Sequence, residues 1–153
     1  MERAEKAAEL FLEGYNCAQA VFVAYSDLTG LTPEYAARLA SSFGGGMGRL
    51  REVCGAVSGM LMVTGCLYGY HTPGDDKQKM ELYALVQQLS AQFREQTGSI
   101  VCREILKYPP SDPTPTPRTA EFYQKRPCAR MVLLAGQILD AYLAQNPPKQ
   151  KLF

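Results

Sequence analysis

The sequence predicts an all-α fold, a compact bundle of about five to seven helices around one central helix. Apolar residues recur at helical spacing along most of the chain, and no segment shows the alternating pattern of a strand. Glycine, proline and N-capping residues separate these periodic segments. The length of 153 residues fits one domain whose core needs no disulfide bonds, so we expect residues 1–153 to form a single helical domain.

Two short amphipathic helices are predicted at the start of the chain. The first spans residues 3–13 and ends at Gly14, with an inner face formed by Ala4, Ala7, Ala8 and Phe11. Asn16 is a good N-cap for the second because its side chain can accept a hydrogen bond from an exposed backbone N–H. The inner face of this second helix consists of Cys17, Ala20, Val21 and Ala24. Cys17 is therefore expected to face inward from a first helical turn.

A third helix is predicted to begin with Thr32 as N-cap and Pro33 at the first helical position. Tyr35 stands where a complete capping box has glutamate or glutamine, so the box is incomplete. The predicted inner stripe is Ala36, Leu39, Ala40 and Phe43. The glycine-rich stretch 44–48 must then end the helix in a tight loop.

The predicted central helix covers residues 52–68 and has two apolar faces. The first face consists of Val53, Val57, Met60, Leu61, Thr64 and Leu67. The second, with smaller residues, consists of Ala56, Gly59, Val63 and Cys66. After a turn at residues 71–76, a long amphipathic helix ends near Gly98, and its stripe is Leu82, Leu85, Val86, Leu89 and Phe93.

The last third of the chain predicts two helices separated by a proline-rich connection. Ser99 is expected to cap a short helix that carries Cys102. Residues 108–119 contain five prolines and few apolar side chains, which predicts an extended surface connection within the same domain. A final helix begins at Pro127 and stops at residues 146–148, with a stripe of Met131, Leu134, Ala135, Ile138 and Tyr142.

Charge and composition argue against several classes of function. Lysine and arginine total 16 against 15 acidic residues, a net charge of +1, so no basic excess indicates nucleic acid. The charged N-terminus does not resemble a secretory signal, and the apolar stretch 53–70 is too short and too interrupted for a membrane span. We therefore expect a cytoplasmic protein. The single histidine, His71, lies in a turn, and the chain has no haem-attachment motif.

The cysteines provide the strongest functional signal. Cys17, Cys54, Cys102 and Cys128 each stand at a predicted helix start, whereas Cys66 does not. A helix N-terminus favours a thiolate by roughly 0.3–1 kcal/mol, which lowers a thiol pKa by only about 0.2–0.7. Reactive thiols would need further positive charge. Arginines near these cysteines can supply it if they point inward, namely Arg49, Arg51, Arg103, Arg126 and Arg130.

Four glycines are candidates for contact with a cofactor: Gly45, Gly46, Gly55 and Gly59. Without side chains they let another helix or a cofactor approach closely, and helix packing through small residues is an equally good interpretation. The glycine-rich loop lacks the Lys-Ser/Thr ending of a P-loop, and no strand precedes it. A nucleotide site is therefore disfavoured.

Two strings then carry a resemblance to a known family. Phe43-Gly44-Gly45-Gly46-Met47-Gly48 is followed by Cys54-Gly55-Ala56-Val57-Ser58-Gly59, with Asn16-Cys17-Ala18-Gln19 upstream and further cysteines at 102 and 128. These residues resemble the C_GCAxxG_C_C family, whose members are described as redox-active. The resemblance covers nearly the whole chain and implies that Cys17, Cys54, Cys102 and Cys128 are the family cysteines, with Cys66 outside the pattern.

Three chemistries remain open for these four cysteines. They can bind an iron–sulfur cluster for electron transfer or redox sensing, which we favour because the set contains no Cys-x-x-Cys. They can bind structural zinc, or act as catalytic thiols that cycle between dithiol and disulfide in an oxidoreductase. A helical interaction module with buried cysteines is the non-redox alternative. A redox partner protein would serve the first interpretation, and a homodimer would cover the second face of the central helix.

Overall fold

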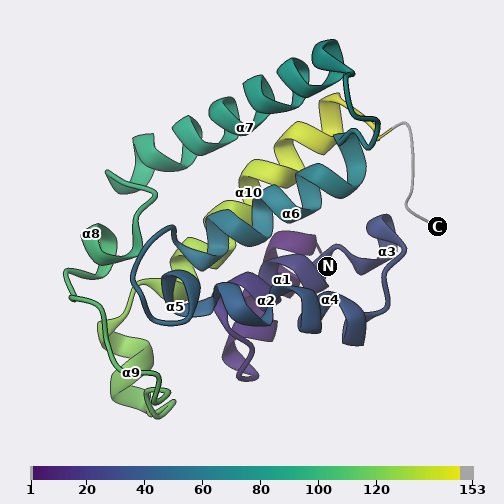
Figure 1. The fold of residues 1–153 in the computed structure, drawn as a ribbon. Coiled ribbons are helices and arrows are strands. Elements are labelled where there is room, and N and C mark those ends of the chain that lie inside the picture. Colours follow the sequence, from purple (N-terminus) through teal and green to yellow (C-terminus); the bar gives the residue numbers. More distant parts are fainter. Residues whose placement is uncertain (1, 149–153) are drawn as a thin grey trace.

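A computed structural model describes residues 2–148 and confirms the all-α prediction (Figure 1). Within these residues no strand forms, and the only β-type pairing is an isolated antiparallel bridge between Val53 and Val101. A 3-10 turn, η1, spans Ser41–Phe43. The helices are α1 (Arg3–Leu12), α2 (Cys17–Ala24), α3 (Ser26–Thr29), α4 (Pro33–Ala40), α5 (Gly44–Met47), α6 (Gly55–Tyr68), α7 (Asp76–Thr97), α8 (Cys102–Leu106), α9 (Ala120–Lys125) and α10 (Cys128–Gln145).

Helix α6 is central, as its two apolar faces predict. It packs against α2 on one side and against α7 and α10 on the other, while α1 lies between α2 and α10 (Figure 1). Side chains from both faces are fully buried, among them Val57, Met60, Val63 and Leu67. Within residues 2–148 no helix combines the length and apolar character that crossing a bilayer requires.

The predicted caps fix where the helices begin. The Asn16 side chain accepts a hydrogen bond from the Gln19 N–H, and the Gln19 side chain accepts one from the Asn16 N–H, which completes a capping box. Gln19 also donates to the Ala37 carbonyl and so ties α2 to α4. Thr32 caps α4 as expected, and Asp75 caps α7. The start of α2, and with it Cys17, is therefore held by local hydrogen bonds and by a neighbouring helix.

Several details differ from the sequence prediction. Leu39 is 53% exposed, because α4 lies at the edge of the bundle and buries only its alanines against α2. The N-cap of α8 is Val101; the Ser99 hydroxyl instead accepts from the Val101 N–H and bonds to Glu104. Helices α3, α5 and α9 were not expected; α5 is a single turn within the predicted glycine loop, and Gly45 and Gly46 inside it have left-handed backbone conformations. That residues 1–153 form one domain stays a prediction, and Met1 and residues 149–153 lie outside the described part.

Candidate functional site

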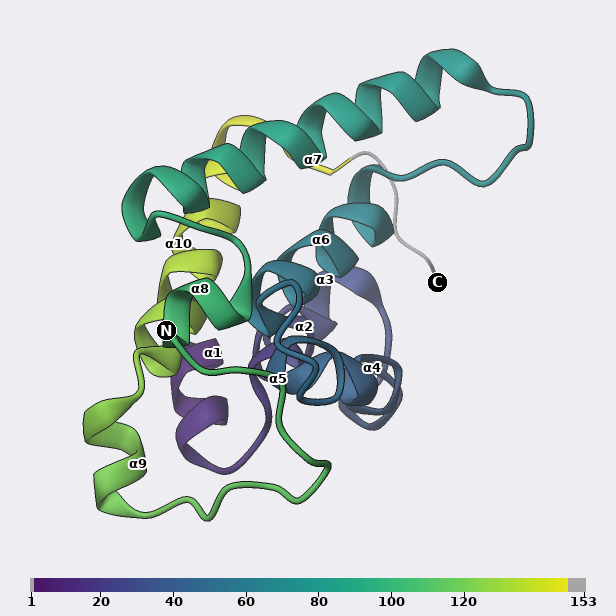
Figure 2. The same ribbon diagram turned by 60° about the vertical axis from the view of Figure 1, so that its left-hand side comes forward.

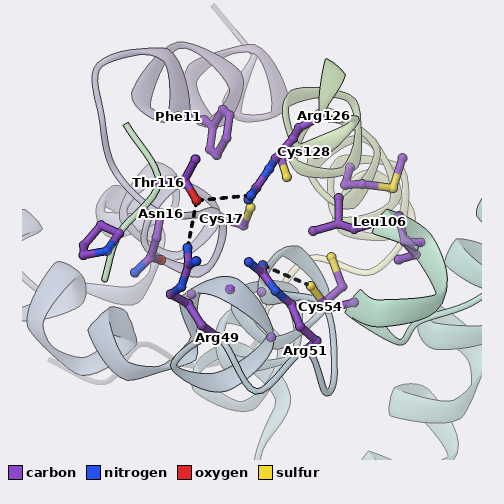
Figure 3. Close-up of a pocket in the computed structure, with 18 of the residues that line it drawn as sticks. Phe11, Asn16, Cys17, Arg49, Arg51, Cys54, Leu106, Thr116, Arg126 and Cys128 are labelled. Atoms are coloured by element: carbon purple, nitrogen blue, oxygen red, sulfur yellow. Dashed lines mark hydrogen bonds between the residues drawn. The ribbon is translucent and has the colours of Figure 1, made fainter. Parts of the chain in front are cut away.

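All four cysteines that begin helices line one cavity of about 220 Å³ (Figure 3). Cys17, Cys102 and Cys128 are the first residues of α2, α8 and α10, and Cys54 is the N-cap of α6. Cys66 lies near the other end of α6, half-buried and outside the cavity. Four helix N-termini far apart in the sequence thus meet at one place.

Two glycines on α6 allow it to approach the start of α2. A Cβ at Gly59 would lie 2.7 Å from the Ala18 carbonyl oxygen, and one at Gly55 would lie 3.1 Å from the Cys17 Cβ. The two positions are one helical turn apart and therefore face the same way. Gly55 also lines the cavity, whereas Gly59 makes a helix contact outside it. The Cys-Gly-Ala-x-x-Gly string thus brings Cys54 next to Cys17.

Gly45 and Gly46 shape the wall of the cavity opposite α10. Both have left-handed backbone conformations, with φ of +68° and +69°. A Cβ at Gly46 would lie 2.6 Å from the Cys102 Cβ and 2.8 Å from the Arg51 Cα. Both glycines line the cavity, and Gly46 lets the loop close directly onto Cys102 and Arg51.

Backbone hydrogen bonds between two loops hold Cys54 beside Cys102. The Cys54 N–H donates to the Ile100 carbonyl at 2.8 Å, and the Cys102 N–H donates to the Glu52 carbonyl. These bonds flank the Val53–Val101 bridge. This pairing was not predicted from the sequence, where its only local signal is a β-branched valine immediately before each cysteine.

Cys17 and Cys128 lie side by side in the cavity, and each shifts the pKa of the other (Figure 3). The pKa of Cys128 is lowered to about 7. The largest cause is a hydrogen-bonding interaction with the Cys17 thiol, and the charges of Arg126, Arg118 and Arg51 lower the pKa further, whereas burial raises it. The same hydrogen bond, together with burial, raises the pKa of Cys17 well above its ordinary value. Near neutral pH the pair therefore consists of a thiolate at Cys128 and a thiol at Cys17.

The other two cysteines stay protonated at neutral pH. Burial raises the pKa of Cys54 to about 12, although the N–H groups of Ala56 and Val57 partly oppose this. Burial also raises the pKa of Cys102, against a hydrogen bond from Arg51, whose Nη1 lies 3.9 Å from Sγ (Figure 3). A position at a helix N-terminus alone does not make these thiols acidic, which agrees with the small dipole effect.

Three of the five arginines expected near the cysteines line the cavity. Arg51 is 1% exposed, and its Nε and Nη2 atoms have no hydrogen-bond partner among residues 2–148. Arg49 Nη1 and Arg126 Nη2 both donate to the Thr116 hydroxyl, at 2.9 and 3.2 Å (Figure 3). The other two lie outside: Arg103 pairs with Glu52, and Arg130 is exposed on α10.

The proline-rich segment supplies a wall of the cavity that the sequence did not reveal. It runs outside the helices between α8 and α9 (Figure 2), but Pro115, Thr116 and Arg118 line the cavity. Arg118 donates to the carbonyls of Phe11 and Tyr15, both at 3.0 Å, and so ties the segment to the end of α1 and the loop before α2. Proline content predicts an extended path but not the surface that this path covers.

Fold and site together define an all-α protein with four cysteines around one cavity. A family model described as "Putative redox-active protein (C_GCAxxG_C_C)" matches residues 15–142, a span that includes all four. The chain belongs to this family. No curated protein and no solved structure matches it significantly.

The pKa of Cys128 leads to a testable pH profile. We expect its alkylation by iodoacetamide to quicken about tenfold per pH unit up to about pH 7 and then to level off, because only the thiolate reacts. Cys54 should stay unreactive through this range because its pKa lies near 12. Peptide mass spectrometry of the labelled reduced protein measures both rates.

The matched variant for this profile is Cys17→Ala, which removes the hydrogen bond that lowers the Cys128 pKa most. Its midpoint should move upward, toward the ordinary thiol value of about 8.5. A wild-type midpoint near 8.5, or one unchanged by the substitution, would contradict the paired geometry.

Proposed function

We propose that this protein is a thiol–disulfide redox protein in which Cys17 and Cys128 cycle between dithiol and disulfide. The placement of these two thiols side by side in one cavity, where each shifts the pKa of the other, is the observation that carries the proposal. Thiol–disulfide exchange needs one thiolate as nucleophile and a second thiol within reach to resolve the mixed disulfide. Cys128 has the pKa of a nucleophile at neutral pH, and Cys17 is the adjacent resolving thiol.

An iron–sulfur cluster on all four cysteines is the second candidate, favoured by the single cavity that they share. The donor set fits such a cluster in kind, since four cysteine thiolates are its usual ligands, and the cluster would supply one-electron transfer. Within residues 2–148, however, no three Cys, His, Asp or Glu side chains are placed so that they could hold a metal ion. This spacing disfavours a single ion such as structural zinc, and the neighbouring thiols of Cys17 and Cys128, one of them with a lowered pKa, favour the dithiol over a cluster.

Anaerobic purification followed by metal analysis, visible absorption and redox titration tests the proposal. We expect no stoichiometric iron or zinc, and a two-electron oxidation that joins Cys17 to Cys128, mapped by mass spectrometry of the unreduced peptides. Cys128→Ser should abolish this oxidation. Cys66→Ser is the matched control and should leave it intact, because Cys66 lies outside the cavity.

Two outcomes would overturn the dithiol proposal. Coloured protein with stoichiometric iron that Cys54→Ser removes would establish the cluster instead. A disulfide that joins Cys54 to Cys102 while Cys17 and Cys128 stay reduced would show that the proposed pair is not the reactive one. We also propose the cytoplasm as the compartment, because free thiols are kept reduced there.

A further inference from the structure

The cavity carries an excess of positive charge. The described residues that line it include four arginines, namely Arg49, Arg51, Arg118 and Arg126, and no aspartate or glutamate. Within the described residues none of the four forms an ion pair with a carboxylate; the nearby Glu52 pairs with Arg103, and Arg49 contacts Asp112 only through its backbone carbonyl. Among the described residues that line the cavity, only Cys128 supplies a negative charge near neutral pH. Four cations thus face one anion.

Arg51 shows where a further anion would bind. It is a buried charged side chain, and a buried charge without a partner is strongly unfavourable. Its Nη1 points to the Cys102 sulfur, which leaves Nε and Nη2 free. These two nitrogens form one edge of the guanidinium, the edge that binds both oxygens of a carboxylate or similar oxyanion. Both nitrogens are enclosed by protein atoms, so an oxyanion in the cavity would bind this edge after the Arg51 side chain moves toward it.

The size of the cavity limits what can bring that group to the thiols. Cys54 and Cys102 are 7% and 6% exposed, and the cavity of about 220 Å³ is closed on one side by the segment that contains Pro115 and Thr116. A space of this size fits a small molecule better than the folded surface of another protein. The ligand must therefore combine a small body with an oxyanion.

We propose that the exchange substrate of the Cys17–Cys128 pair is a small anionic disulfide, whose carboxylate or other oxyanion group binds the free edge of Arg51. This inference rests on the proposed dithiol function and adds the class of substrate to it. Arg49 and Arg126 add positive charge at the same cavity wall, where Thr116 holds both. A neutral or cationic disulfide lacks the group that these arginines attract.

The exchange balances without a further reactant. The Cys128 thiolate attacks one sulfur of the substrate disulfide, the substrate S–S bond breaks, and one half leaves as an anionic thiolate. The Cys17 thiol then loses its proton to solvent and its sulfur attacks Cys128 in the mixed disulfide, which releases the second half as a thiolate. The protein is oxidised by two electrons, and the substrate is reduced to two thiols.

Three small disulfides that differ in charge test this substrate class: dithiodipropionate is dianionic, hydroxyethyl disulfide is neutral and cystamine is dicationic. Each is mixed anaerobically with the reduced full chain, and formation of the Cys17–Cys128 disulfide is followed by mass spectrometry. Each rate is divided by that of the urea-unfolded chain, which removes intrinsic differences in reactivity. We expect the dianion to react at least about tenfold faster than the neutral compound and cystamine to react slowest.

Arginine variants show which side chains produce the preference for the dianionic disulfide. Arg51→Gln should remove most of it, and Arg126→Gln, at a half-buried position, should reduce it even if the first variant folds poorly. Arg130→Gln is the matched control, since it removes the same charge from an exposed position on α10 outside the cavity. This variant should keep the full preference for the dianion.

The possible failures are distinguishable. Equal normalised rates for the three disulfides would overturn the substrate class and leave the dithiol function standing. A dianion preference that survives in both Arg51→Gln and Arg126→Gln would overturn the proposed anion site. If none of the three compounds oxidises Cys17 and Cys128, the dithiol function and the substrate class fail together.

Discussion

Gly59→Ala is expected to lower the free energy of unfolding by about 2–3 kcal/mol, a large effect for one added methyl group. The new Cβ would lie 2.7 Å from the Ala18 carbonyl oxygen and 2.9 Å from the Val21 Cβ. The first contact is with backbone, which cannot rotate away as a side chain can. Helix α6 would have to move off α2, and this movement would also separate Cys54 from Cys17. Urea denaturation of the reduced protein measures the change.

Gly65→Ala is the control on the same helix. No atom lies within 4 Å of a Cβ built there, so the only effect is the better helix propensity of alanine. This variant should be more stable than the parent by about 0.5–1 kcal/mol. Equal stabilities of the Gly59 and Gly65 variants would refute the close contact between α2 and α6.

Gly46→Ala should disrupt the cavity itself. Its Cβ would lie 2.6 Å from the Cys102 Cβ and 2.8 Å from the Glu52 backbone nitrogen, and φ of +69° adds strain for a residue with a side chain. We expect a loss of about 3 kcal/mol in the free energy of unfolding and a change in the Cys128 alkylation midpoint, because Arg51 must move with the loop. Denaturant titration and the iodoacetamide profile provide the two readouts.

Gly48→Ala is the control for Gly46→Ala, because it introduces backbone strain without steric crowding. Gly48 has φ of +59°, similar to that of Gly46, but its Cβ would meet only the Ser42 carbonyl oxygen, at 4.0 Å. Backbone strain alone should lower the free energy of unfolding by about 1 kcal/mol and leave the midpoint of Cys128 alkylation unchanged. If both variants lose the same stability, the approach of Gly46 to Cys102 has no energetic importance.

Local sequence patterns were sufficient to predict where most helices begin. The hydrogen bonds that cap a helix form within three residues, so Asn16 and Thr32 could be identified as N-caps without knowledge of the fold. The same local signals placed Cys17 and Cys128 at helix starts. Short helices such as α9 were not predicted, because they have too few turns to show the helical periodicity of apolar residues.

The chemistry of the site depended on contacts that no local pattern encodes. The pKa of Cys128 is set first by Cys17, from the opposite end of the chain, and then by arginines that include Arg118. Arg118 lies in a segment whose sequence indicates only an extended path. The direction of Arg51 likewise follows from the turn at Gly45 and Gly46. Tertiary packing decides which charges face a thiol, and a sequence read locally cannot show it.

The position of the thiol pair also links its redox state to the stability of the whole protein. A bond between Cys17 and Cys128 would close a loop of about 110 residues, which in the chain-entropy model stabilises the folded state by about 4–5 kcal/mol. A thermodynamic cycle then makes this disulfide harder to reduce in the folded protein than in the unfolded chain by the same free energy. Oxidation would thus affect the whole fold and not only the cavity. The oxidised protein would unfold far less often than the reduced protein, and cellular proteases would therefore degrade it more slowly.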